Sequence, residues 1–155
     1  MSDEKKRAET RDFHPSRRVV SYSREKGGSV FARMRRFFGE SERPRFDLII
    51  LGMGEDGHTA SLFPGSKSLE EKLRFAIPVY LGEPKKNRIT LTLPVLNNAE
   101  QILFLVAGPS KAPVLSEIFG EGEKKRGFPA GLISPTHGTM TWLVDHEAAA
   151  KLRGQ

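Results

Sequence analysis

Two short and almost continuous apolar runs, each followed directly by a glycine, constrain the fold of this chain more than any other feature. Residues 46–51 (FDLIIL) end at Gly52, and residues 102–107 (ILFLVA) end at Gly108. Apolar runs of this length are typical of strands that are covered on both faces. Three further candidate strands are residues 75–80, residues 88–93 and residues 139–145.

Helices are expected between these strands. Residues 110–119 begin with a serine suited to capping and stop before Gly120, and residues 146–152 form a last helix. A further helix is expected over residues 31–38, where apolar side chains recur at helical spacing. The alternation of strand, loop and helix predicts an α/β domain with a mostly parallel, Rossmann-like sheet and helices on both faces. Such sheets bind ligands at the carboxyl ends of their strands.

The positive charge of the chain is concentrated near its start. The formal net charge is +6, and the first 45 residues carry 13 Lys or Arg against 7 Asp or Glu, so the remainder is neutral. Residues 1–29 contain few apolar side chains, so we expect a basic, flexible N-terminal arm, followed by the α/β domain over residues 30–155. Because no stacking aromatic side chains are spaced along this arm, we do not expect a nucleic-acid partner.

The chain contains no cysteine. This composition excludes disulfide frameworks, thiolate metal centres and cysteine nucleophiles, and it is typical of a reducing compartment such as the cytoplasm. No apolar run approaches the roughly 18 residues of a membrane span, so we expect no membrane partner.

The segment richest in chemical information is GMGEDGHTASLFP, residues 52–64, directly after the first predicted strand. Its glycines Gly52, Gly54 and Gly57 match the spacing of a dinucleotide-binding turn. However, Pro64 ends any following helix within about two turns, whereas the dinucleotide helix is longer. The two carboxylates inside the turn would also repel a pyrophosphate. We therefore expect no nicotinamide cofactor.

Asp56 and His58 stand two residues apart in this turn. A neutral imidazole can take a proton from water near neutral pH, and a neighbouring carboxylate can hold its tautomer and stabilise the imidazolium. The pair is therefore a candidate general base with its orienting acid, and a hydrogen-bonded loop histidine is the alternative. The other three histidines show no metal-ligand spacing with His58, so no metal site is expected.

A second candidate site is GPSK, residues 108–111, another turn from strand to helix. Lys111 is expected in the first helical turn, where the helix dipole disfavours a cation and a bound anion would reverse that effect. Free helical amides and an ammonium group suit a phosphate, although an exposed lysine without a ligand is equally compatible. Arg88 would be a second clamp, provided that its strand runs antiparallel to its neighbours.

Three blocks resemble the 6-phosphogluconolactonase family: FDLIILGMGEDGHTASLFPGS, NRITLTLPVLNNAEQILFLVAGPSKAPVL and FPAGLISPTHGTMTWLVDHEAA. The resemblance implies hydrolysis of 6-phosphogluconolactone, in the oxidative pentose phosphate pathway, without metal or cofactor. It implies His58 as general base with Asp56 beside it, and Arg88 and Lys111 as ligands of the 6-phosphate. We further hypothesise that backbone amides of the turn, at Gly52, Gly54 and Gly57, donate to the oxyanion.

The resemblance also implies a sheet that lacks the family's N-terminal strands. We expect the open edge of this sheet to contact a second copy of the chain or another partner. Two alternative functions are kept. A glucosamine-6-phosphate deaminase or isomerase is similar around the same turn, but it follows the histidine with Asn-Glu-Pro where this chain has Leu62-Phe63-Pro64. The other alternative is a non-catalytic sugar-phosphate-binding or assembly module.

Overall fold

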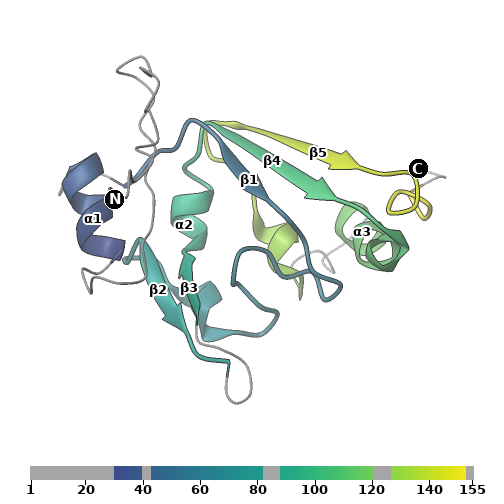
Figure 1. Ribbon diagram of the computed structural model, residues 1–155, viewed down its shortest axis with the longest axis horizontal. Helices are drawn as coiled ribbons and strands as arrows, with labels where there is room; N and C mark the ends of the chain where they lie inside the picture. Colours follow the sequence, from purple (N-terminus) through teal and green to yellow (C-terminus); the bar gives the residue numbers. More distant parts are fainter. Residues whose placement is uncertain (1–29, 40–42, 82–87, 121–126, 153–155) are drawn as a thin grey trace, which may run out of the picture.

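The computed structural model describes residues 30–39, 43–81, 88–120 and 127–152 (Figure 1). The strands in these ranges are β1 (Ile49–Leu51), β2 (Ala76–Val79), β3 (Arg88–Leu91), β4 (Gln101–Val106) and β5 (Thr139–Val144). The helices are α1 (Val30–Phe38), α2 (Leu93–Leu96) and α3 (Ala112–Phe119), with short 3-10 helices η1 (Lys67–Glu70), η2 (Pro109–Lys111) and η4 (Pro129–Leu132). The basic arm expected over residues 1–29 lies outside the described residues. No helix in the described ranges has the length and apolar character of a membrane span.

β1, β4 and β5 form one parallel sheet in the order β1-β4-β5. In register, Leu51 lies beside Phe104 and Phe104 lies beside Trp142, and the last two rings stack with centroids 3.8 Å apart. The expectation of an α/β fold with a mostly parallel sheet is confirmed. β1 and β4 lie within the two predicted apolar runs or within one residue of them, although β1 begins at Ile49 instead of Phe46, and β5 lies within the candidate strand over residues 139–145.

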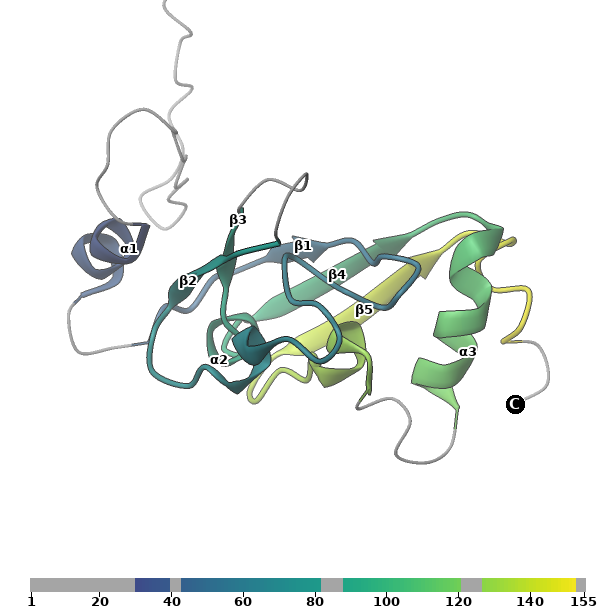
Figure 2. The same ribbon diagram turned by 90° about the horizontal axis from the view of Figure 1, so that it is seen from below.

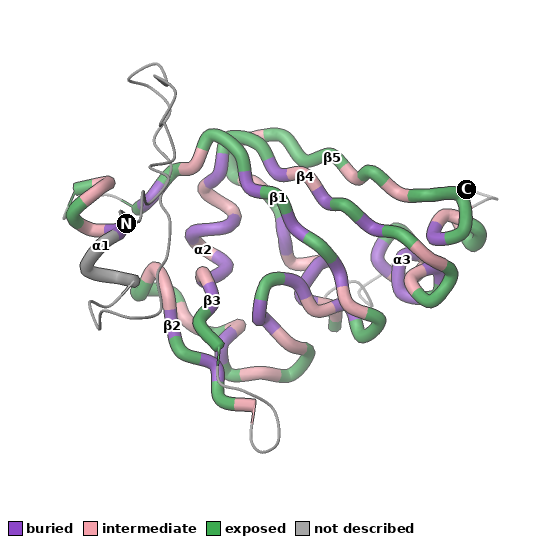
Figure 3. Tube along the Cα trace, viewed as in Figure 1, coloured by how far each residue is buried: buried purple, intermediate pink, exposed green. Residues whose placement is uncertain are grey.

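The two faces of this sheet differ in burial. Ile102, Phe104 and Val106 of β4 point into the core that α2, α3 and η4 complete, whereas the alternate residue Leu105 is 48% exposed. Figure 3 shows the same alternation along β1. Among the described helices, α2, α3 and η4 therefore pack on one face of the sheet, which differs from the expected helices on both faces. The strands follow one another across the sheet in the order of the sequence, β1, β4 and β5. Connections between parallel strands are right-handed, so both connections lie on the same side of the sheet.

The remaining strands, β2 and β3, pair antiparallel in a separate two-stranded sheet. This hairpin and α2 lie towards the amino ends of the parallel strands, whereas α3 lies beside the carboxyl ends of β4 and β5 (Figures 1 and 2). The expected helix near the start of the described chain is confirmed as α1. It buries Met34 and places the ring of Phe38 edge-on to that of Phe46, with centroids 5.0 Å apart.

Two local expectations for helices are wrong. Ser110 does not cap α3, because it lies inside η2 and the residue after it takes the N-cap position. Residues 146–152 form turns instead of a helix. The amides of Ala150 and Leu152 donate to carbonyls three residues back, as in turns. The carboxylate of Asp145 accepts hydrogen bonds from the amides of Ala148 (2.7 Å) and Gly108 (3.0 Å). These bonds tie the segment to the end of β4.

The turn before β2 depends on Glu71. Its carboxylate accepts hydrogen bonds from the amides of Arg74 (2.9 Å) and Leu73 (2.8 Å) and from the Arg74 side chain (2.6 Å), which lower its pKa to about 2. A pKa lowered by folding stabilises the fold above the unfolded value of 4.5, and this contribution is lost as the pH falls towards 2.

We therefore expect Glu71→Gln to make thermal stability less dependent on pH over this acidic range. Thermal unfolding of the parent and the variant at several pH values measures the effect. Glu70→Gln, at the exposed neighbouring carboxyl, is the matched control. Identical pH dependence in Glu71→Gln and the parent would contradict the expected role.

Candidate active site

The loop that follows β1 is a closed turn over residues 52–58. The amide of Gly54 donates to the carbonyl of His58 (2.9 Å), and the amide of Gly57 donates to the carbonyl of Gly54 (3.0 Å). The hydroxyl of Thr59, a fully buried residue, donates to the carbonyl of Gly52 (2.8 Å). These bonds hold the loop at the carboxyl end of β1, where α/β sheets bind their ligands.

His58 and Asp56 contact each other inside this loop. The Nδ1 atom of His58 lies 2.6 Å from Oδ1 of Asp56, which also accepts a hydrogen bond from the His58 amide (3.1 Å). Burial raises the pKa of Asp56, but the hydrogen bonds from His58 and its charge outweigh burial and lower the pKa below 3.8. Asp56 is therefore ionised at neutral pH and can only accept hydrogen bonds. Consequently Nδ1 carries the proton, and the lone pair of neutral His58 lies on Nε2.

Gly54 makes room for this pair, and Gly57 makes room for Phe128. A side-chain carbon at Gly54 would overlap the His58 ring and would lie 2.7 Å from Oδ1 of Asp56. Gly57 has a φ of +75°, and a side-chain carbon there would lie 2.6 Å from the ring of Phe128. Gly54 and Gly57, two of the glycines whose spacing resembles a dinucleotide-binding turn, therefore serve local packing against His58 and Phe128.

The ring of Phe63 lies against the ring of His58. Their centroids are 4.7 Å apart, and their planes are inclined by 36°. Sequence reasoning missed this contact, because four residues lie between His58 and Phe63 and nothing in the pattern alone shows that the chain reverses there.

Lys111 reaches the same region from the end of β4. It is the last residue of η2, directly before α3, and its side chain is 20% exposed. Its Nζ atom lies 3.8 Å from Oε1 of Glu55, in the loop after β1. Because β1 and β4 are parallel neighbours, their carboxyl ends bring the two predicted turns together. The pairing with Glu55 was not expected from the sequence.

Other expected site groups are placed differently. Arg88 opens β3, which pairs antiparallel with β2 in the separate sheet and with no strand of the parallel sheet, and it is exposed. It is not among the described residues that line the cavity beside His58. The amides of Gly54 and Gly57 are both engaged inside the loop. Neither is free to donate to an oxyanion, so the expectation is wrong for these two glycines, and for Gly52 it stays a prediction.

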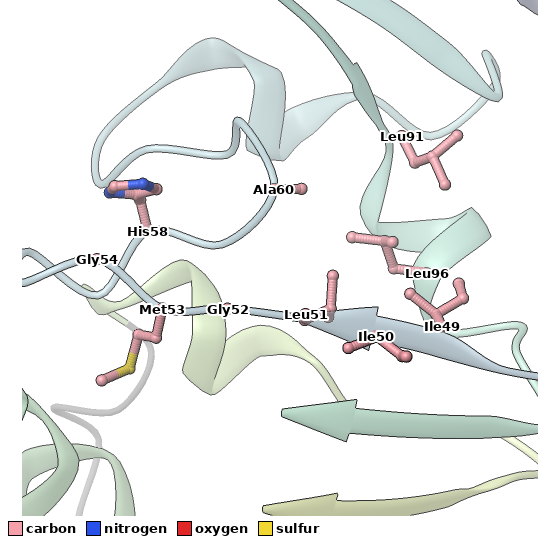
Figure 4. Close-up of a pocket in the computed structure, with 10 residues that line it drawn as sticks. All are labelled: Ile49, Ile50, Leu51, Gly52, Met53, Gly54, His58, Ala60, Leu91 and Leu96. Atoms are coloured by element: carbon pink, nitrogen blue, oxygen red, sulfur yellow. The ribbon is translucent and has the colours of Figure 1, made fainter. Parts of the chain in front are cut away.

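A cavity of about 530 Å³ opens beside His58. Figure 4 shows the His58 ring near one end, Leu91 and Leu96 near the other, and the chain of β1 and the following loop along one side. Among its described lining residues, His58 alone has a titratable side chain. No group of three or more His, Asp or Glu in the described ranges is arranged to hold a metal ion.

Comparisons with known proteins agree with one another. The family described as "Glucosamine-6-phosphate isomerases/6-phosphogluconolactonase" matches residues 5–142. A 6-phosphogluconolactonase of Rattus norvegicus is 43% identical over 121 residues, which are 77% of this chain and 46% of the rat protein. A 6-phosphogluconolactonase of Synechocystis sp. is 44% identical over 111 residues, which are 71% of this chain and 45% of that protein.

Solved structures extend the likeness to the fold. A 6-phosphogluconolactonase from Trypanosoma cruzi has a TM-score of 0.68 at 30% identity, over 78% of this chain and 49% of that one. A monomeric glucosamine-6-phosphate deaminase has a TM-score of 0.52 at 26% identity, over 68% of this chain and 47% of that one. The chain spans about half the length of the curated relatives it matches. On the extent of the family match and the identity to these relatives, the chain belongs to the family of glucosamine-6-phosphate isomerases and 6-phosphogluconolactonases.

Proposed function

We propose that this chain hydrolyses 6-phosphogluconolactone to 6-phosphogluconate, a step of the oxidative pentose phosphate pathway, with His58 as general base. The observation that carries the proposal is the contact between His58 and Asp56, 2.6 Å long, beside a cavity at the carboxyl end of β1. The relatives named 6-phosphogluconolactonase support the choice of substrate. The absence of cysteine supports a cytoplasmic location.

In this mechanism, Nε2 of His58 takes a proton from a water molecule while the water oxygen attacks the lactone carbonyl. Asp56 keeps the other proton on Nδ1 and stabilises the imidazolium. The tetrahedral intermediate then collapses, the bond between the carbonyl carbon and the ring oxygen breaks, and the ring oxygen takes the proton from Nε2. The products are a carboxylic acid, which ionises, and a free hydroxyl group on the same molecule. A lactone carbonyl is already electrophilic, so one base and one water are sufficient.

We propose that Lys111 binds the 6-phosphate and that Arg88 is a second ligand. Lys111 takes the N-cap position of the eight-residue helix α3, where the positive end of the helix dipole favours an anion. Its ammonium group lies near the loop that carries His58, 3.8 Å from Glu55. Arg88 is exposed at the start of β3, whose last residue, Leu91, lines the cavity.

The deaminase or isomerase reaction is less well supported. Enzymes of that kind follow the histidine with a carboxylate-containing Asn-Glu-Pro. The matching segment here is Leu62-Phe63-Pro64, in which Leu62 is fully buried and no residue carries a carboxylate. The group that would assist ring opening is therefore missing from that segment.

Freshly generated 6-phosphogluconolactone tests the proposal directly. Acid release from the lactone by the 155-residue chain is measured and corrected for spontaneous hydrolysis. Ammonia release from glucosamine-6-phosphate is measured in a separate assay. Hydrolysis faster than the spontaneous reaction is the expected result. Binding of 6-phosphogluconate without turnover would identify a binding module, and ammonia release from glucosamine-6-phosphate would identify a deaminase. Either result would overturn the proposal.

Glu55→Gln is expected to strengthen binding of 6-phosphogluconate. The Glu55 carboxylate, which is 70% exposed, lies 3.8 Å from the Lys111 ammonium group, where it competes with a phosphate and repels it. Removing this exposed charge is expected to lower the Kd by about two- to fivefold, and the effect is expected to shrink at high salt. Titration calorimetry measures it, with Glu147→Gln at an exposed carboxyl beyond β5 as control. Weaker binding by Glu55→Gln would contradict the competition.

We also propose that the β1 edge is a contact site for a second copy of the chain or another polypeptide. β1 is an outer strand of the described sheet; Ile50 on it is 57% exposed, and Leu48, directly before it, is 49% exposed. Open apolar edge strands pair readily with other chains. Light scattering of the purified chain measures the association, and the mass of a single chain at all concentrations would exclude the second copy.

A further inference from the structure

Phe63 contacts the candidate base and has no role in the chemistry described above. Its ring centroid lies 4.7 Å from that of His58, with planes inclined by 36°. The other close partner of the imidazole is Asp56, 2.6 Å from Nδ1. The His58 side chain is still 30% exposed, so these contacts, and not complete burial, decide how the ring is oriented.

The chain reverses direction between the two rings. Thr59 and Leu62 form an antiparallel pair in which the amide of each donates to the carbonyl of the other (3.3 and 2.9 Å), and both residues are fully buried. His58 and Phe63 flank this pair, and antiparallel pairing sets such residues opposite each other. Ala60 closes the reversal with a φ of +52°, which is uncommon for a residue with a side chain. The ring contact is therefore supported by a buried, hydrogen-bonded turn.

An aromatic ring in this place affects both the orientation and the charge of the histidine. The χ2 torsion of histidine is broad and roughly two-fold, so a partly exposed imidazole can turn over and exchange its nitrogen and carbon positions. A ring packed against its face restricts that motion. The negative face of an aromatic ring also attracts a cation, which favours the imidazolium that forms when Nε2 takes a proton.

We propose that Phe63 is a positioning residue, which holds the His58 imidazole with Nδ1 on Asp56 and with Nε2 available to the substrate. This inference rests on the proposed hydrolysis, because that reaction is what requires one orientation of the ring. Phe63 touches none of the reacting atoms. Its role requires an aromatic face at this position and not merely an apolar side chain.

Kinetics of three variants test this role. Phe63→Leu removes the aromatic face, and it is expected to lower kcat by about 3- to 10-fold with KM within about twofold of the parent. Phe63→Tyr keeps the face and is expected to restore the parent kcat. Phe119→Leu makes the same change at a ring that contacts Trp142, 5.2 Å between centroids, and is expected to have no effect. Equal losses in Phe63→Leu and Phe63→Tyr, or a rise in KM alone, would overturn the inference.

Long-range 1H–15N spectra of the His58 ring test it without any substrate. With His58 neutral, the parent, Phe63→Tyr and Phe119→Leu are expected to show the form protonated on Nδ1. Phe63→Leu is expected to show averaged nitrogen shifts from a mixture of the two tautomers. Unchanged shifts in Phe63→Leu would overturn the positioning role. If the parent does not hydrolyse the lactone but the spectral difference is present, the proposed function fails while the positioning of His58 stands.

Discussion

Replacing His58 with glutamine is expected to reduce kcat for 6-phosphogluconolactone by about 10²- to 10⁴-fold, the usual contribution of a general base. Glutamine can still donate a hydrogen bond to Asp56, which the histidine contacts through Nδ1 at 2.6 Å. An amide cannot take a proton from water near neutral pH, so the loss falls on the chemical step. KM is expected to change little, because the proposed phosphate ligands are other residues, Lys111 and Arg88.

His146→Gln is the matched control for this variant, because His146 is exposed in the turns after β5. It is expected to retain the parent rate. Initial rates corrected for spontaneous hydrolysis, together with the Kd for 6-phosphogluconate, separate the chemical step from binding. Full activity in His58→Gln would show that another group takes the proton. Weakened binding with an unchanged kcat would assign His58 to substrate binding.

Gly54→Ala is expected to reduce kcat by about 100-fold, because a displacement of about 1 Å at a reacting group causes losses of this size. A methyl group at this position would overlap the His58 ring and would lie 2.7 Å from Oδ1 of Asp56. The clash can be relieved only if the base, its orienting acid or the loop that carries them moves. Each of these movements disturbs the contact between Asp56 and His58.

Gly127→Ala is the control, because a side-chain carbon at Gly127 would have no atom within 4 Å. It is expected to retain both activity and stability. In the double variant Gly54→Ala, His58→Gln, the loss is expected to be no larger than in His58→Gln alone, because both changes act through one group. A Gly54→Ala protein that folds and keeps the parent kcat would show that the ring orientation does not limit the reaction.

The local sequence pattern was sufficient to predict those strands whose formation depends on residues adjacent in the sequence. The apolar run over residues 102–107 predicted β4 to within one residue at either end, and the candidate strand over residues 139–145 likewise matches β5. The pattern was insufficient at residues 146–152, where the amides of Ala150 and Leu152 donate to carbonyls three residues back and the chain forms turns. It also did not show that α2, α3 and η4 lie on one face, because that follows from the order in which the strands are crossed.

The same division applies to the candidate site. The sequence by itself determined the pair of Asp56 and His58, because a carboxylate two residues before a histidine in a tight turn can reach both its amide and its ring. Only the tertiary structure decided the rest of the site's surroundings. Phe63 reaches His58 through a chain reversal, and Lys111 reaches the same loop because β1 and β4 are parallel neighbours. Contacts between distant residues depend on how strands pair and where turns reverse the chain, and spacing along the sequence does not contain that information.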